Sequence, residues 1–225
     1  MIFRCLTIFP DSFRSYLNEG ILKRAQDKGI IRCLTYNLRD WTKDRHRSVD
    51  DAPYGGGAGM LMKIEPLYLA LRDIKRLNRK KDLKRKIVLL SASGKKWDQS
   101  LAERYAKLDE LIIVCGRYEG VDARIKKFVD TEISIGDYVL SGGELPAMVM
   151  IDSISRLLPG VLGNRDSLIE ESHNRGVIGE YPQYTRPEVF QAGKRRLTVP
   201  KALLSGDHAK IKAWREKKTK INKPA

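Results

Sequence analysis

Short apolar segments alternate with longer segments of helical periodicity over about the first 160 residues of this chain. The apolar segments have the length and composition of β-strands, and they lie at residues 2–9, 30–38, 87–91, 111–115 and 132–135. Several of them are apolar at successive positions, which is typical of strands buried on both faces. This order of strands and helices predicts an α/β fold with a mostly parallel sheet.

The segments between the strands predict amphipathic helices. Their apolar side chains recur every three to four residues, at 12–28, 65–78, 98–108 and 121–128. A longer helix is predicted over residues 144–158, because Pro146 is tolerated in a first turn and Pro159-Gly160 would end the helix.

The character of the chain changes after residue 162. Residues 163–176 are polar, show little periodicity and are typical of an exposed linker. The remainder includes a basic helical segment at 208–220 behind Asp207 as its N-cap, but it is too short to bury a large core. We therefore expect an α/β domain over residues 1–162, a linker over 163–177 and a small basic helical domain over 178–225.

Positive charge is concentrated in two segments. Residues 72–86 hold nine basic and two acidic side chains, and residues 194–225 hold eleven and two, whereas the whole chain carries +15. The rest of the chain is therefore close to neutral. Two separate cationic surfaces predict a polyanionic partner, and they favour nucleic acid over a surface that is merely solvated.

The chain shows the features of a cytoplasmic protein. No stretch of 18 apolar residues could span a membrane, and the first residues carry no basic leader followed by an apolar run. Cys5, Cys33 and Cys115 are odd in number and widely spaced, so they provide neither a disulfide framework nor a CxxC pair.

Glycine-bearing loops follow three of the predicted strands, at residues 91–94, 115–120 and 135–144. In an open α/β sheet, ligands bind where the carboxyl ends of the strands meet their loops. Three such loops predict one small-molecule pocket. Backbone N–H groups at the start of the helix after Gly142-Gly143 could hold polar atoms of the ligand.

A further glycine-rich run, at residues 53–60, matches neither a phosphate loop nor a dinucleotide fingerprint. Because basic and hydroxyl side chains precede it, we expect a loop that faces RNA, with a flexible surface loop as the alternative. His46, His173 and His208 share no ligand spacing, so no metal site is predicted. Cys115 ends an apolar strand and is expected to be a small buried side chain, not a nucleophile.

Several strings in the chain carry a specific resemblance. They are DRHRSVDD and PYGGG at residues 44–51 and 53–57, VCGRYEGVD at 114–122, SIGDYVLSGGELP at 134–146, PQYTRP at 182–187 and LSGDH at 204–208. In this order they closely resemble bacterial tRNA (guanine-N1)-methyltransferases, the TrmD family, over most of the chain.

The resemblance implies a SPOUT-type α/β fold with a deep trefoil knot. It implies S-adenosylmethionine as methyl donor, N1 of guanine 37 in tRNA as acceptor, and a homodimer with active sites at the subunit interface. It also implies dependence on Mg²⁺, for which the sequence shows no side-chain cage.

The resemblance further assigns roles to residues. The residues expected to contact the cofactor are Ser91, Gly94, Gly116, Ile135, Gly136, Asp137, Tyr138, Val139, Leu140, Gly142, Gly143 and Pro146. Arg156 matches the catalytic arginine of the family. The family's general base is an aspartate in the linker, two residues before an aromatic. Glu171 takes that position here, with His173 in place of the aromatic, and Glu170 is the alternative base.

These residues suit the expected chemistry. Methylation of guanine N1 requires an aligned methyl donor and removal of the N1 proton, without a covalent enzyme intermediate. A carboxylate at Glu171 could take the proton, and Arg156 could stabilise negative charge on the purine O6. Two alternatives stay open: a non-catalytic RNA-binding protein that uses only the basic surfaces, and a related methyltransferase with another base or target nucleotide.

Overall fold

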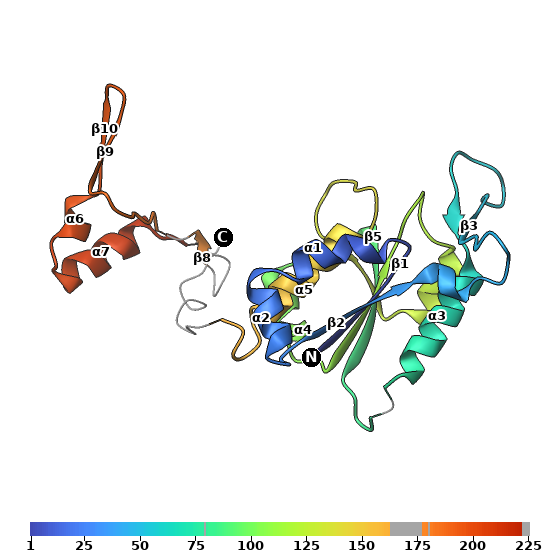
Figure 1. Cartoon of the computed structure of the whole chain (residues 1–225). Coiled ribbons are helices and arrows are strands. Elements are labelled where there is room, and N and C mark those ends of the chain that lie inside the picture. Colours follow the sequence, from blue (N-terminus) through green and yellow to red (C-terminus); the bar gives the residue numbers. More distant parts are fainter. Residues whose placement is uncertain (79, 163–176, 180, 222–225) are drawn as a thin grey trace. The chain divides into compact units, whose positions relative to one another are not determined.

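The structure is a computed structural model, and it describes residues 1–78, 80–162, 177–179 and 181–221 (Figure 1). The chain divides into two compact units, Met1–Gly163 and Asn164–Ala225. Each unit is described by itself. The expected linker at residues 163–176 lies outside the described residues.

The larger unit is built on a five-stranded sheet in the order β2-β1-β6-β5-β7. The strands are β1 (Ile2–Thr7), β2 (Arg32–Asn37), β5 (Arg85–Lys96), β6 (Glu110–Cys115) and β7 (Thr131–Ser134). All neighbouring pairs in this sheet are parallel, so the carboxyl ends of the strands share one edge. The predicted α/β fold with a mostly parallel sheet is confirmed.

Helices cover both faces of the sheet. Figure 1 shows α1 (Arg14–Leu17), α2 (Gly20–Asp27), α4 (Gln99–Tyr105) and α5 (Glu144–Ser155) on one side, and α3 (Ile64–Arg76) on the other. The central strand β6 is buried at all six positions. Its odd-numbered side chains pack with the α5 side, and its even-numbered apolar side chains, Ile112 and Val114, pack with α3. This is the two-sided burial that the apolar runs predict.

The predicted helix at residues 12–28 is wrong as a single element. The segment instead forms a 3-10 helix, η1 (Pro10–Phe13), followed by α1 and α2. The break falls at Asn18-Glu19, where Gly20 takes a φ of 57°, a left-handed conformation that glycine adopts without steric cost. Likewise, the helix expected at 121–128 is a 3-10 helix, η3 (Ala123–Phe128), capped by the Asp122 side chain on the Arg124 N–H.

The third predicted strand, at residues 87–91, is longer than expected. Strand β5 continues to Lys96, and both Leu90 and Lys95 align with Ile133 of β7. The extra residues between these two positions form an irregularity within the strand. The expected loop at 91–94 is therefore a bulge in β5, not a connection to the next helix.

The glycine-rich run at residues 53–60 connects two short antiparallel strands, β3 (Asp50–Asp51) and β4 (Leu61–Met62). It lies against the loop that follows β6, because the Glu119 N–H donates to the Met60 carbonyl at 3.1 Å. At Gly59, an added Cβ would overlap the Glu119 side chain. The run is thus part of the structure around that loop, and its role in RNA contact stays a prediction.

In the smaller unit, the described residues include the helices α6 (Lys201–Leu204) and α7 (His208–Lys218). The predicted cap of α7 is confirmed, since Asp207 accepts hydrogen bonds from the N–H groups of Ala209 and Lys210. The unit also contains antiparallel strands that the sequence did not predict. They are the pair β8 (Val177–Gly179) with β11 (Lys220–Ile221) and the hairpin β9 (Val189–Ala192) with β10 (Arg195–Thr198). The expected basic helical segment is thus present as α7, and the antiparallel strands beside it were not expected.

Candidate active site

A cavity of about 480 Å³ opens at the edge of the sheet where β5, β6 and β7 end. The three segments that the sequence singled out converge there, since the β5 bulge, the loop after β6 and the loop between β7 and α5 all contribute to its wall. Most of the expected cofactor residues line it: Ser91, Gly116, Ile135, Gly136, Tyr138, Val139, Leu140, Gly142, Gly143 and Pro146. The parallel sheet brings them together because its strands end at one edge.

Two of the expected cofactor residues are not among those that line the cavity. Gly94 lies in β5 against β7, where an added Cβ would be 2.5 Å from the Ile133 nitrogen, so its small size lets the two strands approach. Asp137 forms an exposed ion pair with Lys96, at 2.6 Å from Oδ2 to Nζ. Gly94 thus lets two strands of the sheet approach each other, and Asp137 forms an ion pair on the surface; neither residue lines the cavity.

A buried carboxylate ties the cavity wall to the sheet. Glu144, at the first position of α5, is 3% exposed and accepts hydrogen bonds from Thr7 Oγ1 at 2.6 Å and from Arg117 Nε at 2.9 Å. Arg117 Nη1 also donates to the Ser141 carbonyl at 3.2 Å. Since Thr7 ends β1, Arg117 follows β6 and Ser141 precedes α5, one carboxylate connects three elements.

The backbone approaches itself closely at Gly143. A Cβ at this position would lie 2.7 Å from the Cα of Cys115, and the Gly143 N–H donates to the Gly116 carbonyl at 2.9 Å. Arg117 and Gly142 form an antiparallel bridge beside this contact. A residue with a side chain at 143 would therefore push the two loops apart.

The loop after β6 carries cavity residues that the sequence analysis quoted but did not single out. Tyr118 lines the cavity with a φ of 59°, a left-handed conformation that costs a non-glycine residue about 1–2 kcal/mol. Glu119 and Lys126 also line it, and Lys126 pairs with Glu132 at 3.0 Å. The signal for Tyr118 and Glu119 was present in the motif VCGRYEGVD, which contains both.

Of the two expected catalytic residues, the structure describes only Arg156. Arg156 is the C-cap of α5, partly buried, and is absent from the described lining. Glu171 and the alternative base Glu170 lie outside the described residues, as does His173. Cys115 is fully buried, and desolvation raises the pKa of its thiol well above the usual range, which fits a packing role.

The fold and the cavity define an α/β protein with a cavity of small-molecule size at the carboxyl ends of its parallel strands. Within the described residues, no group of three or more His, Cys, Asp or Glu side chains could hold a metal ion. In the same part of the chain, every helix is too short or too polar to cross a membrane.

Comparison with known proteins gives the family. Residues 1–224 match the model of the family described as tRNA (Guanine-1)-methyltransferase TrmD. A tRNA (guanine-N(1)-)-methyltransferase of Dictyoglomus turgidum is 52% identical over 97% of this chain and 86% of its own length. Those of Desulfitobacterium hafniense and Chloroflexus aggregans are 49% and 51% identical, over 97% and 96% of this chain and 80% and 81% of their own lengths. The chain belongs to the tRNA (guanine-N1)-methyltransferase family.

Proposed function

We propose that this protein transfers a methyl group from S-adenosylmethionine to N1 of guanine 37 in tRNA, next to the anticodon. The observation that carries the proposal is the cavity at the strand ends. Ten of the twelve residues that the family resemblance assigned to the cofactor line this one cavity, although they come from three separate segments of the chain.

The cavity suits a molecule of this kind. Its volume of about 480 Å³ is within the roughly 300–1,000 Å³ usual for small-molecule sites. Its wall combines the apolar side chains Ile135, Val139 and Leu140 with the glycines Gly116, Gly142 and Gly143, which have no side chain to fill the space. Apolar surface can cover an adenine ring, while backbone N–H and C=O groups can hydrogen-bond polar atoms. S-adenosylmethionine supplies a methyl group already activated by the positive sulfonium.

The protein must then orient guanine and remove its N1 proton. We assign proton removal to Glu171, with Glu170 as the competing carboxylate, and stabilisation of charge on O6 to Arg156. A base on the polar linker expected from the sequence suits a residue that orders over the substrate.

An exposed apolar patch supports the proposal of a homodimer. We define the dimer patch as Phe9, Tyr16, Leu145 and Val149, which are 46%, 48%, 59% and 44% exposed. Tyr16 donates a hydrogen bond to Asp152, one turn beyond Val149, so α1 and α5 share this face. The patch meets the cavity wall at Phe9, because the guanidinium carbon of Arg117, a lining residue, lies 4.6 Å from the centroid of the Phe9 ring. A second copy on this face would bury the patch and close the cavities at the interface.

The position of Arg156 fits such a dimer. It follows Pro146 by ten residues along α5, or about 15 Å of helix, so it lies far from the cavity of its own chain. The pKa of Tyr16, a residue of the dimer patch, is raised, chiefly by its hydrogen bond to Asp152. The positive charge of Arg156 acts in the opposite direction and lowers this pKa, so Arg156 lies close enough to the patch to affect it. We propose that each Arg156 serves the cavity of the partner subunit.

From the family resemblance, we also propose a deep trefoil knot. In this knot, the loop before α5 would thread through the neighbouring loops. The bridge between Arg117 and Gly142 supports it, because it places two of these loops in direct contact.

We further propose that residues 178–225 form a tRNA-binding domain joined by a linker over 163–177. We also propose that the enzyme works in the cytoplasm and that it depends on Mg²⁺.

The proposal is tested by mapping the product. The purified protein is titrated with S-adenosylmethionine by calorimetry and then incubated with unmodified tRNA carrying guanine 37 or adenine 37. We expect binding of the cofactor and 1-methylguanosine at position 37 of the first tRNA alone. Binding of tRNA without binding of the cofactor would instead favour the non-catalytic RNA-binding protein, and methylation at another nucleotide would favour a related methyltransferase.

A further inference from the structure

A basic surface lies at the end of the sheet opposite to the cavity. We define the basic turn as residues 72–86, which run from the last turn of α3 to the first residues of β5. Five of its lysines are exposed: Lys75, Lys80, Lys81, Lys84 and Lys86. The proposed methyl transfer uses none of them.

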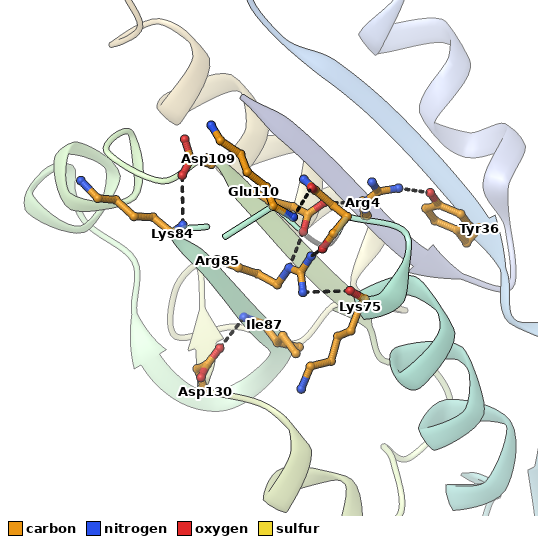
Figure 2. A network of polar contacts seen from close by, with 11 residues as sticks. Arg4, Tyr36, Lys75, Lys84, Arg85, Ile87, Asp109, Glu110 and Asp130 are labelled. Atoms are coloured by element: carbon orange, nitrogen blue, oxygen red, sulfur yellow. Dashed lines mark hydrogen bonds and ion pairs between the residues drawn. The ribbon is translucent and has the colours of Figure 1, made fainter. Parts of the chain in front are cut away.

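A buried network holds this turn in place (Figure 2). Glu110 is 0% exposed, and its two carboxylate oxygens accept from Arg4 Nε, at 2.6 Å, and from Arg85 Nε. Arg85 also donates to the carbonyls of Lys75, at 3.0 Å, and Asn78, at 2.8 Å. A buried carboxylate is tolerated only when its partners are in place, so the guanidinium of Arg85 fixes both ends of the turn to the sheet.

Asp109 and Asp130, which lie beside the turn, accept hydrogen bonds from backbone N–H groups at its end, not from lysine ammonium groups. Asp109 accepts from the Lys84 N–H at 3.0 Å, and Asp130 accepts from the Ile87 N–H at 2.6 Å, as Figure 2 shows. Within residues 1–78 and 80–162, the ammonium groups of Lys80, Lys81, Lys84 and Lys86 form no hydrogen bond or ion pair. The fold therefore leaves these four exposed ammonium groups without an ion pair to any described residue.

The basic turn is too far from the cavity to contact the same small ligand. Arg85 begins β5 and the cavity lining on this strand begins at Leu89, so four residues of strand, roughly 13 Å, separate them. A partner that reaches both must be a long polyanion. A lipid surface is a poorer match, because Leu67, Leu71 and Ile74 of α3 are buried in the core, and the single exposed Leu77 of the turn does not make an apolar face.

We propose that the basic turn binds phosphates of the tRNA outside its anticodon stem-loop, while guanine 37 of the same molecule occupies the cavity region. This inference rests on the proposed function, since it takes tRNA as the substrate. The turn supplies affinity and orientation without reading bases, because lysine ammonium groups contact phosphates as point charges.

The test compares a triple variant, Lys80→Gln/Lys81→Gln/Lys84→Gln, with a matched control, Lys23→Gln/Arg24→Gln/Lys28→Gln, which removes three exposed charges from α2 and its C-cap residue. Affinity is measured for full-length tRNA and for an isolated anticodon stem-loop over a series of salt concentrations. We expect the turn variant to bind full-length tRNA on the order of tenfold more weakly, with a log–log salt slope lower by about one for each lysine. Its affinity for the stem-loop, like the affinity of the control variant for both RNAs, is expected to stay unchanged.

The other outcomes overturn the inference. Unchanged affinity of the turn variant for full-length tRNA would show that the basic turn does not bind it. An equal loss for the stem-loop would place the contact inside the stem-loop, and an equal loss in the control would show a general charge effect. Loss of binding to anionic lipid vesicles with unchanged tRNA affinity would favour a lipid surface. Failure of the proposed function is distinguished by the wild-type protein, which would then not methylate guanine 37 in either RNA.

Discussion

The Nε of Arg117 donates to Oε2 of Glu144 at 2.9 Å, and this ion pair joins the loop after β6 to the first turn of α5. The Glu144 carboxylate is buried, while the Arg117 side chain is 25% exposed and reaches the cavity wall. The pair therefore links the buried sheet to the loops that we assign to the cofactor, and we expect stability and cofactor binding to depend on the same carboxylate.

Glu144→Ala is expected to lower both the free energy of unfolding and the affinity for S-adenosylmethionine. The change leaves Arg117 and the Thr7 hydroxyl without their acceptor, which we expect to cost about 2–3 kcal/mol of unfolding free energy. Affinity for S-adenosylmethionine should fall as well, because Arg117 no longer fixes the loop at Ser141. Urea denaturation and calorimetry measure the two effects.

Glu65→Ala is the control for this variant. Glu65 pairs with Lys43 at 2.8 Å, but both side chains are more than half exposed, so its loss should cost less than about 1 kcal/mol. Equal losses of stability in the two variants would contradict the structural role given to Glu144.

Gly142→Val is expected to abolish binding of S-adenosylmethionine. A Cβ at this position would overlap the Arg117 side chain, and the β-branched valine would restrict the backbone beside the cavity. Calorimetry on a variant shown to be folded by its denaturation midpoint makes the measurement. If the folded variant kept the wild-type affinity, the loop at 135–143 would not form the cofactor site.

Glu171→Gln is expected to lower single-turnover methyl transfer by roughly 10²- to 10⁴-fold, because it removes the proposed base while keeping its size. Cofactor affinity should hardly change. Glu170→Gln is the matched control and should remain active. The reverse result would move the base to Glu170, and full activity in both variants would place proton removal elsewhere.

Arg156→Ala is expected to lower methyl transfer by on the order of 10²-fold or more, through loss of O6 stabilisation. Mixed dimers test whether Arg156 serves the partner subunit. When an Arg156→Ala chain is combined with a Gly142→Val chain, one site should regain an intact cavity and an intact arginine, so activity should return. If Arg156 acted on the cavity of its own chain, both sites of the mixed dimer would stay defective.

Removal of residues 194–225 is expected to weaken tRNA binding and to reduce its salt dependence. This segment holds eleven basic and two acidic side chains, and each phosphate contact contributes about 0.9 to the log–log slope on a duplex. Filter binding over a salt series, with cofactor calorimetry as the check on the remaining unit, makes the measurement. An unchanged slope would show that the tail does not contact phosphates.

Much of the larger unit could be predicted because its signals are local. Strand β6 is a run of apolar residues, and such a run predicts a buried strand wherever it occurs. The Asp207 cap of α7 is equally local, since the carboxylate binds N–H groups two and three residues ahead. The cavity followed from the glycine-bearing segments together with the rule that parallel strands end at one edge.

The hairpin of β9 and β10 could not be predicted in the same way. Its strands have four residues each, and Phe190 opposite Leu197 is their one pair of large apolar side chains. Such short alternation is too weak a signal beside the basic composition, which favoured a helical interpretation.

The amino-acid sequence by itself determined the alternation of strands and helices, the basic segments and the order of the glycine-bearing segments. Only the tertiary structure decided that β5 bulges against β7, that Glu144 joins Thr7 to Arg117, and that Glu110 holds Arg4 and Arg85. The partners in the Arg4–Glu110 contact are 106 residues apart in the chain. Hydrophobic periodicity reports on neighbours within a few residues, whereas such contacts form only when the parallel sheet sets which strands lie side by side.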